Sequence, residues 1–250
     1  MCIKTEFIDI DERIDGLGNG ELICIASSPN KDLTTFVYNI LKNVTENGVP
    51  TLLFSKDEKE DIEKELVKVT TCLSGNIGET IMNLELLEWN ITICDHDIDT
   101  IDEIEVISKA KSKRGVELIV INNLQNLKIK GQDDSKQSLE EISKRLKKLA
   151  EETNKTIIVL SELPKEIEER TDHRPTRADI KDYGITKYAD TILFIYRDDY
   201  YNADSEKKHI VEVNTVKSKN GNIGTEELLI LYDTKYFNLE KMERTIREWK

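Results

Sequence analysis

The sequence predicts an α/β fold, with a mostly parallel central sheet flanked by helices and an antiparallel hairpin at one edge. Short runs rich in Ile, Leu and Val alternate with longer segments of helical period, which is typical of parallel strands joined by crossover helices. The apolar runs are continuous, as expected for strands buried on both faces. After His209 the pattern changes to two strand-like runs around a glycine-containing turn, which indicates a hairpin.

The apolar runs and the helical periods place the elements in order. Strands are expected at residues 21–27, 50–55, 91–94, 116–121, 156–161 and 190–196, and helices at 32–47, 59–73, 100–113 and 137–153. Thr100 and Glu103 form a capping-box signature before the third helix. The hairpin is expected from "HIVEVNTVKS" and "EELLILYD" around "KNGNIGT", and a short amphipathic tail over 239–249. No repeat or proline-rich linker divides the chain, so residues 1–250 are expected to form one domain.

Composition narrows the function classes. The 49 acidic and 36 basic side chains leave a formal charge of -13, which disfavours non-specific adhesion to nucleic acid or to an anionic membrane. The four cysteines are widely spaced and are expected to be buried thiols in a reducing compartment, with neither a metal site nor a disulfide framework. The three histidines lack a metal-ligand spacing. With no signal segment and no run long enough to span a bilayer, a cytoplasmic protein is expected.

Several phrases, in sequence order, resemble the C-terminal, RecA-like motor domain of DnaB-type replicative helicases. These are "DERIDGLGNGELICIASSPNKDLTTF", "TLLFSKDE", "ELIVINNLQNL", the region from "TIIVLSELPKE" to "FIYRDDYYN", and "VKSKNGNIGT". The resemblance runs from about Phe7 to Leu239 and implies a RecA-like P-loop NTPase fold. Because the chain starts almost at the motor domain, the family's N-terminal domain and linker helix are expected to be absent. A monomer or weak oligomer is then favoured over a stable homohexamer.

The resemblance places a phosphate loop at residues 27–34, where the residues depart from the family pattern. A GxxxxGK[ST] loop uses glycines to wrap phosphates with backbone N–H groups, a lysine to neutralise them and a hydroxyl for magnesium. The matching nucleotide-site positions end in Asn30, Lys31, Asp32, Leu33 and Thr34, and only the hydroxyl of Thr34 is kept. One like-charge pair ~4 Å apart costs roughly 4 kcal/mol at an effective dielectric of ~20. Asp32 is expected to repel phosphate, and an N-cap role for it in the next helix agrees with that, because the carboxylate would lie where a phosphate oxygen otherwise binds. Lys31 is an alternative, displaced lysine.

Four further positions of the implied site also differ. Asn122 stands where the family has its metal-binding aspartate, so Thr34 and Asn122 form at most a vestigial magnesium site. Asp57, with Glu58 adjacent, matches the general-base glutamate. Glu162 matches the glutamine that senses the γ-phosphate. Lys219 matches the arginine finger of the hairpin, while Lys217 keeps the family's lysine, and a lysine lacks arginine's bidentate fork.

In the family, two loops hold single-stranded DNA, and they match residues 128–136 and 164–184. The candidate phosphate contacts are Lys128, Lys130, Lys165, Arg170, Arg174, Arg177 and Lys181. Acidic residues, among them Asp133, Asp134 and Glu166, are interleaved with them. Phosphate contact needs clustered, uncompensated positive charge, so a solvated loop of mixed charge with weak DNA contact is favoured. Tyr200 and Tyr201 are expected either to flank a nucleotide base or to pack a loop.

Three functional hypotheses follow. The preferred one is a degenerate DnaB-like motor domain that hydrolyses little or no ATP and acts by binding a replicative helicase subunit or its loader, with Lys217 and Lys219 toward the partner. The second is a divergent, active ATP-dependent helicase that assembles a site from Lys31, Thr34, Asp57 or Glu58, and Lys217, with ATP and Mg²⁺ as cofactors. The third is a RecA-fold interaction protein unrelated to replication. ATP titration separates the first two, and co-purification with a helicase tests the third.

Overall fold

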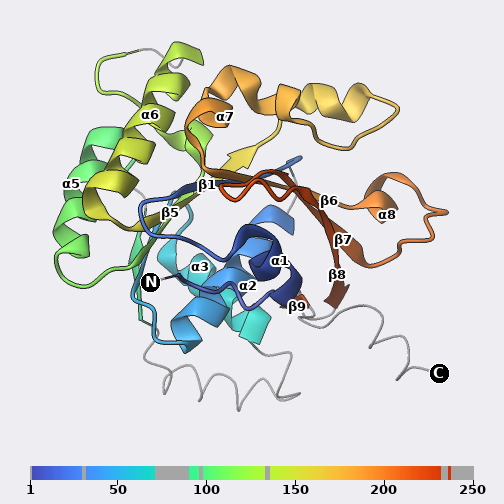
Figure 1. The fold of residues 1–250 in the computed structure, drawn as a ribbon, viewed down its shortest axis with the longest axis horizontal. Helices are drawn as coiled ribbons and strands as arrows, with labels where there is room; N and C mark the ends of the chain where they lie inside the picture. Colours follow the sequence, from blue (N-terminus) through green and yellow to red (C-terminus); the bar gives the residue numbers. More distant parts are fainter. Residues whose placement is uncertain are drawn as a thin grey trace.

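A twisted central sheet runs through the molecule with helices on both faces (Figure 1). The computed structural model describes residues 2–29, 32–70, 90–95, 98–132, 136–231 and 236–237. Within these residues the sheet has nine strands in the order β3-β2-β4-β5-β1-β6-β7-β8-β9. The first six in this order pair in parallel, and β7, β8 and β9 continue the sheet as antiparallel strands.

The strands follow the apolar runs of the sequence. They are β1 (Leu22–Ser27), β2 (Thr51–Ser55), β3 (Ile91–Cys94), β4 (Leu118–Asn122), β5 (Thr156–Glu162), β6 (Thr191–Tyr196), β7 (Ile210–Lys217), β8 (Gly224–Leu231) and β9 (Tyr236–Phe237). All residues of β1, β2 and β6 are buried, as expected for strands covered on both faces.

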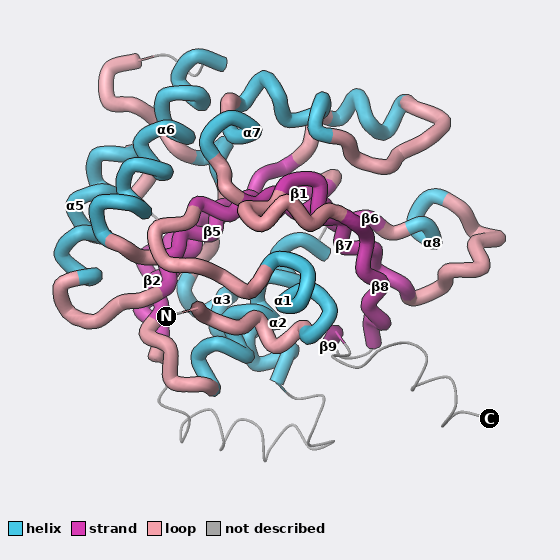
Figure 2. The backbone as a smooth tube through the Cα atoms, viewed as in Figure 1, coloured by secondary structure: helices cyan, strands magenta, loops and turns pink. Residues whose placement is uncertain are grey.

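The helices form two layers (Figure 2). On one face lie α1 (Ile8–Ile14), α2 (Asp32–Glu46) and α3 (Lys59–Thr70), and on the other lie α5 (Ile101–Ser112), α6 (Lys136–Thr153) and α7 (Ile185–Tyr188). A further short helix, α8 (Asp198–Tyr201), follows β6. Short 3-10 helices lie at Leu124–Asn126, Lys165–Glu169 and Arg177–Tyr183.

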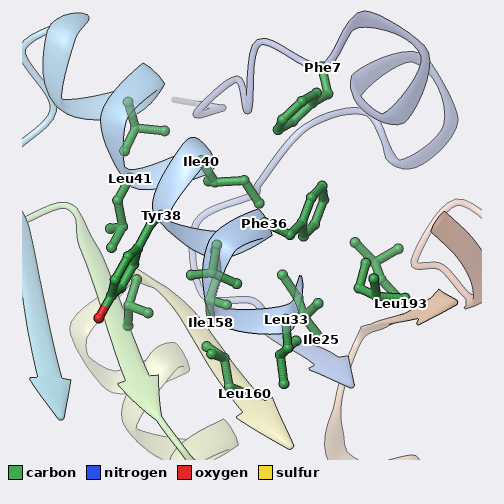
Figure 3. Close-up of a cluster of buried hydrophobic side chains, with 14 of the residues drawn as sticks. Phe7, Ile25, Leu33, Phe36, Tyr38, Ile40, Leu41, Ile158, Leu160 and Leu193 are labelled. Carbon is green, nitrogen blue, oxygen red and sulfur yellow. The ribbon is translucent and has the colours of Figure 1, made fainter. Parts of the chain in front are cut away.

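Strand periodicity divides the core into two clusters. Ile23 and Ile25 of β1 face α1, α2 and α3, whereas Leu22, Cys24 and Ala26 face α5 and α6. On the first face Phe7 stacks on Phe36 of α2 with ring centroids 5.3 Å apart (Figure 3). The segment before α1 is therefore part of this core.

The structure confirms the predicted α/β architecture and the hairpin at the sheet edge. Every expected strand forms within two residues of its expected bounds, as do the helices α2, α5 and α6. The capping box of Thr100 and Glu103 is present. The short helices α1, α7 and α8 and the strand β9 were not predicted from the sequence. The end of the helix expected at 59–73 and the tail at 239–249 lie outside the described residues.

The cysteine prediction was only partly right. Cys24 is buried in β1, whereas Cys94 is half-buried on β3, the outer strand of the described sheet, and Cys2 is exposed near the start of the chain. Cys72 lies outside the described residues. Among the residues that the structure describes, no helix combines the length and the hydropathy that crossing a bilayer requires.

Candidate nucleotide site

The candidate site lies along the carboxyl edge of the parallel strands. Because these strands run in one direction, the order β2-β4-β5-β1-β6 places the residues that follow each strand in one row. Ser55 of β2 lies opposite Asn122 of β4, and Ser27 of β1 lies opposite Glu162 of β5. The sequence-predicted residues Asp57, Asn122 and Glu162 and the loop after β1 therefore share one edge.

Asp57 and Asn122 bind each other at one end of this edge. The amide nitrogen of Asn122 donates to Asp57 Oδ2 and to Ser55 Oγ, both at 3.3 Å. The Ser55 hydroxyl also donates to Asp57 Oδ2, at 3.0 Å. The Asp57 carboxylate thus accepts hydrogen bonds from two neutral groups. One of them belongs to Asn122, at the position where the resemblance implies an anionic metal ligand. Glu58, the alternative general base, is exposed at the start of α3.

Glu162 is held by the 3-10 turn that follows β4. Asn123 donates its side-chain amide to Glu162 Oε1 at 3.2 Å. Gln125 brackets the Glu162 backbone, since it accepts from its N–H at 3.2 Å and donates to its C=O at 2.8 Å. The Glu162 side chain is exposed, and the Asn123 amide is its described side-chain donor.

Leu33, at the position of the phosphate-loop lysine, is a core residue. Its side chain is 4% exposed and belongs to the hydrophobic cluster between α2 and the sheet. Figure 3 shows it beside Ile25 and Leu160, beneath α2. The first turn of α2 thus contributes apolar packing at this position instead of a cation for a phosphate.

Asp32 forms a buried ion pair that the sequence did not predict. Helix α2 begins at Asp32, and Lys31 before it lies outside the described residues, so the N-cap role of Asp32 stays a prediction. Both of its carboxylate oxygens accept from Arg197 Nη1 at 3.3 Å. The guanidinium also donates from Nε and Nη2 to Asp199, at 3.0 and 3.1 Å. Arg197 is 8% exposed and has a carboxylate on either side.

The remaining predicted positions of the phosphate loop are Asn30, Lys31 and Thr34. Thr34 is half-buried on the first turn of α2. Asn30 and Lys31, including the alternative lysine, lie outside the described residues. Within the described part of the chain, no three His, Cys, Asp or Glu side chains are grouped so as to hold a metal ion. Thr34 and Asn122 remain the implied magnesium positions.

Lys217 and Lys219 lie at the opposite edge of the sheet, because β7 runs antiparallel to β6 and ends beside Ile192. Lys217 Nζ donates to the carbonyls of Thr186 and Ala189 at 3.1 and 2.5 Å, and burial lowers its pKa. Lys219 pairs with Glu21 at 2.6 Å, and its side chain is 63% exposed. Both line a hollow of about 520 Å³ together with Lys147, Lys187, Tyr188 and Asp190.

Comparison with known proteins identifies the family. The family model described as "DnaB-like helicase C terminal domain" matches residues 2–239. The chain belongs to this family. Replicative DNA helicase DnaB of Geobacillus stearothermophilus is 33% identical over 261 residues, which is 96% of this chain and 57% of that relative. Replicative DNA helicase DnaC of Bacillus subtilis (strain 168) gives the same identity and coverage. The chain thus spans a little over half the length of these curated relatives.

Two solved structures of similar proteins share this fold. An ATPase domain superposes with a TM-score of 0.86 at 27% identity, covering 95% of this chain and 91% of that one. A DnaB-like replicative helicase, whose structure was solved to describe its interactions with primase, gives a TM-score of 0.85 at 26% identity, covering 94% of this chain and 61% of that one. The RecA-like motor fold implied by the sequence is therefore confirmed.

The two loops that match the DNA-binding loops of the DnaB-like family carry paired charges. Arg170 pairs with Asp179 at 2.9 Å and also donates to the Arg174 carbonyl. Arg174 donates to both carboxylate oxygens of Glu212, at 3.2 and 3.1 Å, and its guanidinium lies 4.5 Å from the centre of the Tyr196 ring. Arg170 thus joins parts of the loop and Arg174 holds the loop against β7, so both present less uncompensated charge than their positions suggested.

The other candidates in these loops lie on the surface. Lys128 pairs with Asp99 at 3.2 Å. The remaining candidates, Lys130, Lys165, Arg177 and Lys181, are exposed. Asp133 and Asp134 lie outside the described residues. The paired lysine and arginines agree with a solvated loop of mixed charge.

The tyrosines after β6 pack the loop. Tyr201 stacks on His173 with ring centroids 4.2 Å apart and donates its hydroxyl to Glu168 at 2.8 Å. Burial raises its pKa to about 12, while a hydrogen bond with Ser28 of the phosphate loop opposes that rise. Tyr200 meets Tyr201 edge-on and is 60% exposed. Tyr201 thus links the loop after β1 to the segment after β5.

Arg197, Asp199, Asn123 and Gln125 were not among the site residues predicted from the sequence. A usable signal for Arg197 was its position directly after a fully buried strand that neighbours β1. An arginine at the carboxyl end of such a strand meets the loop that follows β1. Asn123 and Gln125 follow β4 in the same way.

Proposed function

We propose that this chain is a DnaB-type motor domain that binds ATP weakly or not at all and acts in DNA replication by binding another replication protein. One observation carries the proposal: the phosphate-loop helix begins with an aspartate paired to a buried arginine, followed by a leucine packed in the core. In a working phosphate loop the same positions bring backbone donors and a cation to the phosphates.

The described side chains fit magnesium triphosphate poorly. Asp32 and Glu162 bring negative charge to the edge where a polyanion would lie. A like-charge contact at ~4 Å opposes binding by roughly 4 kcal/mol at an effective dielectric of ~20. Asn122 directs its amide N–H groups to Asp57 and Ser55, and hard divalent cations prefer anionic oxygen. Each of these features weakens retention of ATP.

Membership of the DnaB-like family suggests the partner, a replicative helicase subunit or its loader. The relatives are named replicative helicases, and one similar structure is of a DnaB-like replicative helicase and its interactions with primase. On this chain, Lys219 at the end of the hairpin is exposed and Lys217 lies in the adjoining hollow. These two lysines are the side chains we assign to contact with a neighbouring molecule. Contact with single-stranded DNA is secondary and weak in this proposal.

Calorimetric titration with ATP and Mg²⁺ tests the proposal. We expect no saturable heat below millimolar ATP, whereas micromolar binding would contradict the proposed loss of the nucleotide site. Asp32→Gly combined with Leu33→Lys should restore measurable binding, because it removes a negative charge and adds the missing cation. Co-purification with a replicative helicase tests the partner. Failure to recover one under mild conditions argues for an interaction protein unrelated to replication.

A divergent, active helicase is the second candidate. Thr34 on the first turn of α2, and Asp57 beside Asn122, favour it, since a hydroxyl and a carboxylate both follow strands at the carboxyl edge of the sheet. This candidate predicts ATP hydrolysis that Asp57→Asn or Thr34→Val abolishes. An absence of turnover above a buffer blank, with the fold intact, argues against it.

A further inference from the structure

The guanidinium of Arg197 is divided between two carboxylates from different parts of the chain. Its Nε and Nη2 edge faces Asp199, two residues along, and the two bonds form a fork at 3.0 and 3.1 Å. Its Nη1 faces Asp32 at the start of α2, at 3.3 Å from each oxygen. Two sides of one arginine thus hold two negative groups, one local and one distant.

We propose that Asp32 is an intramolecular substitute for a phosphate oxyanion and that Arg197 is the group that receives it. This autoinhibitory contact rests on the proposed function and deepens it, since it gives weak nucleotide binding a physical cause. A carboxylate and a phosphate present similar oxygens to a guanidinium, and arginine binds either through paired hydrogen bonds. With Asp32 in place, that side of Arg197 already carries an anion.

Burial makes the contact effective. Arg197 is 8% exposed, and the side chains of Asp32 and Asp199 are 14% and 11% exposed. Solvent screening is weak at such exposure, so charge at the contact acts strongly on an incoming anion. Asp32 and Asp199 between them occupy both sides of the guanidinium. An oxyanion must therefore displace Asp32 before it can bind there.

The contact also ties two segments of the edge together. Asp32 starts α2, and Arg197 follows β6, the neighbour of β1. Removing the Asp32 carboxylate does not leave the arginine unpaired, because Asp199 retains the fork. A variant at position 32 is therefore expected to fold, which makes the proposal testable in the full chain.

Inorganic pyrophosphate is the probe, measured by calorimetry and by thermal melting. We expect the unaltered protein to bind pyrophosphate only weakly, with a dissociation constant in the millimolar range or above. Asp32→Asn keeps the side-chain shape and removes the charge, and Asp32→Gly removes the side chain, so each should bind pyrophosphate at least about tenfold more tightly. At tenfold excess over the dissociation constant, the melting temperature should rise by about 3 to 5 °C.

Two control variants test whether any gain in pyrophosphate binding depends on Arg197. Adding Arg197→Gln to Asp32→Asn should abolish the gain, and retention of pyrophosphate binding in that double variant would overturn the proposal. Glu226→Gln relieves another partly buried arginine, Arg13, far from this edge, and should bind pyrophosphate no more tightly than the unaltered chain. The proposal also fails if Asp32→Asn and Asp32→Gly fold and bind no more pyrophosphate than the unaltered chain. Failure of the proposed function is seen separately, as micromolar ATP binding by the unaltered chain.

Discussion

The side-chain amide of Asn122 donates to the carboxylate of Asp57 across 3.3 Å, joining the ends of β4 and β2. An amide at this position satisfies Asp57 without a cation. A carboxylate here would face Asp57 directly and would need a positive charge between the two. The choice of asparagine thus sets whether this edge of the sheet depends on a metal ion.

Asn122→Asp should therefore make stability depend on magnesium. Without metal, loss of the hydrogen bond and repulsion from Asp57 should lower the free energy of unfolding by about 1 to 3 kcal/mol. Mg²⁺ at millimolar concentration should return part of it, because two carboxylates form an anionic oxygen site. Thermal melting with and without MgCl₂ measures both effects.

The matched control is Asn47→Asp, since Asn47 also donates an amide to a carboxylate, Glu6, at 3.0 Å, but on an exposed surface. This variant should show little magnesium dependence. An equal response of the two variants to Mg²⁺ would argue against a vestigial metal site at Asn122.

Leu33→Lys should destabilise the ligand-free protein, because it replaces a core side chain at 4% exposure by a charged one. Loss of packing and burial of the amine together predict about 2 to 4 kcal/mol, read from urea unfolding. Ile8→Lys, at a position 57% exposed, is the control and should change stability by less than about 0.5 kcal/mol. A Leu33→Lys variant as stable as the unaltered chain would mean that its side chain leaves the core for the phosphate loop.

Arg174→Gln should show a stability loss that depends on pH. Burial raises the pKa of Glu212, but hydrogen bonds from Arg174 and Lys207 outweigh it and leave that pKa below its ordinary value. A lowered carboxylate pKa stabilises the fold above the unfolded value, near 4.5, and this contribution is lost as pH falls through the folded value. The variant should lose about 1 to 2 kcal/mol at neutral pH and progressively less below pH ~4.

Unfolding curves from pH 3 to 7 test this, with Lys181→Gln, an exposed residue of the same loop, as the control. The control should leave stability nearly unchanged throughout. A pH-independent loss in Arg174→Gln would show that Arg174 stabilises the fold through its packing on Tyr196 and not through its charge.

The sequence predicted the layers of the fold better than the contacts of the site. Continuous apolar runs sufficed for β1, β2 and β6, because strands buried on both faces need them along their whole length. The four-residue helices α7 and α8 are too short for a helical period to show. The replacements at Asp32, Leu33 and Asn122 were visible because each departs from a motif with a known spacing.

The partner of Asp32 was not visible in the same way. Arg197 and Asp32 are 165 positions apart, and only the placement of β6 beside β1 brings them together. A capping preference can be predicted from neighbouring residues, whereas an ion pair between distant residues depends on the tertiary fold. For the same reason Arg170 and Arg174 were predicted as DNA contacts, although their acidic partners lie 9 and 38 positions away.

Lys217 and Lys219 should separate stability from partner binding. Lys217→Met removes two hydrogen bonds to backbone carbonyls and should cost about 1 kcal/mol. Lys219→Met removes an exposed ammonium from the buried carboxylate of Glu21, which keeps the Gly18 N–H as a donor, and should cost up to about 1 kcal/mol. If the hairpin contacts a partner, Lys219→Met should still weaken binding to an active DnaB-type helicase several-fold, measured by co-sedimentation at low salt. Added salt should lower the affinity of the unaltered chain for that helicase toward the affinity of the variant. Lys144→Met, which removes another exposed lysine, paired with Glu141 on α6, should leave that binding intact. Equal binding by the Lys219 and Lys144 variants would remove the hairpin from the interface.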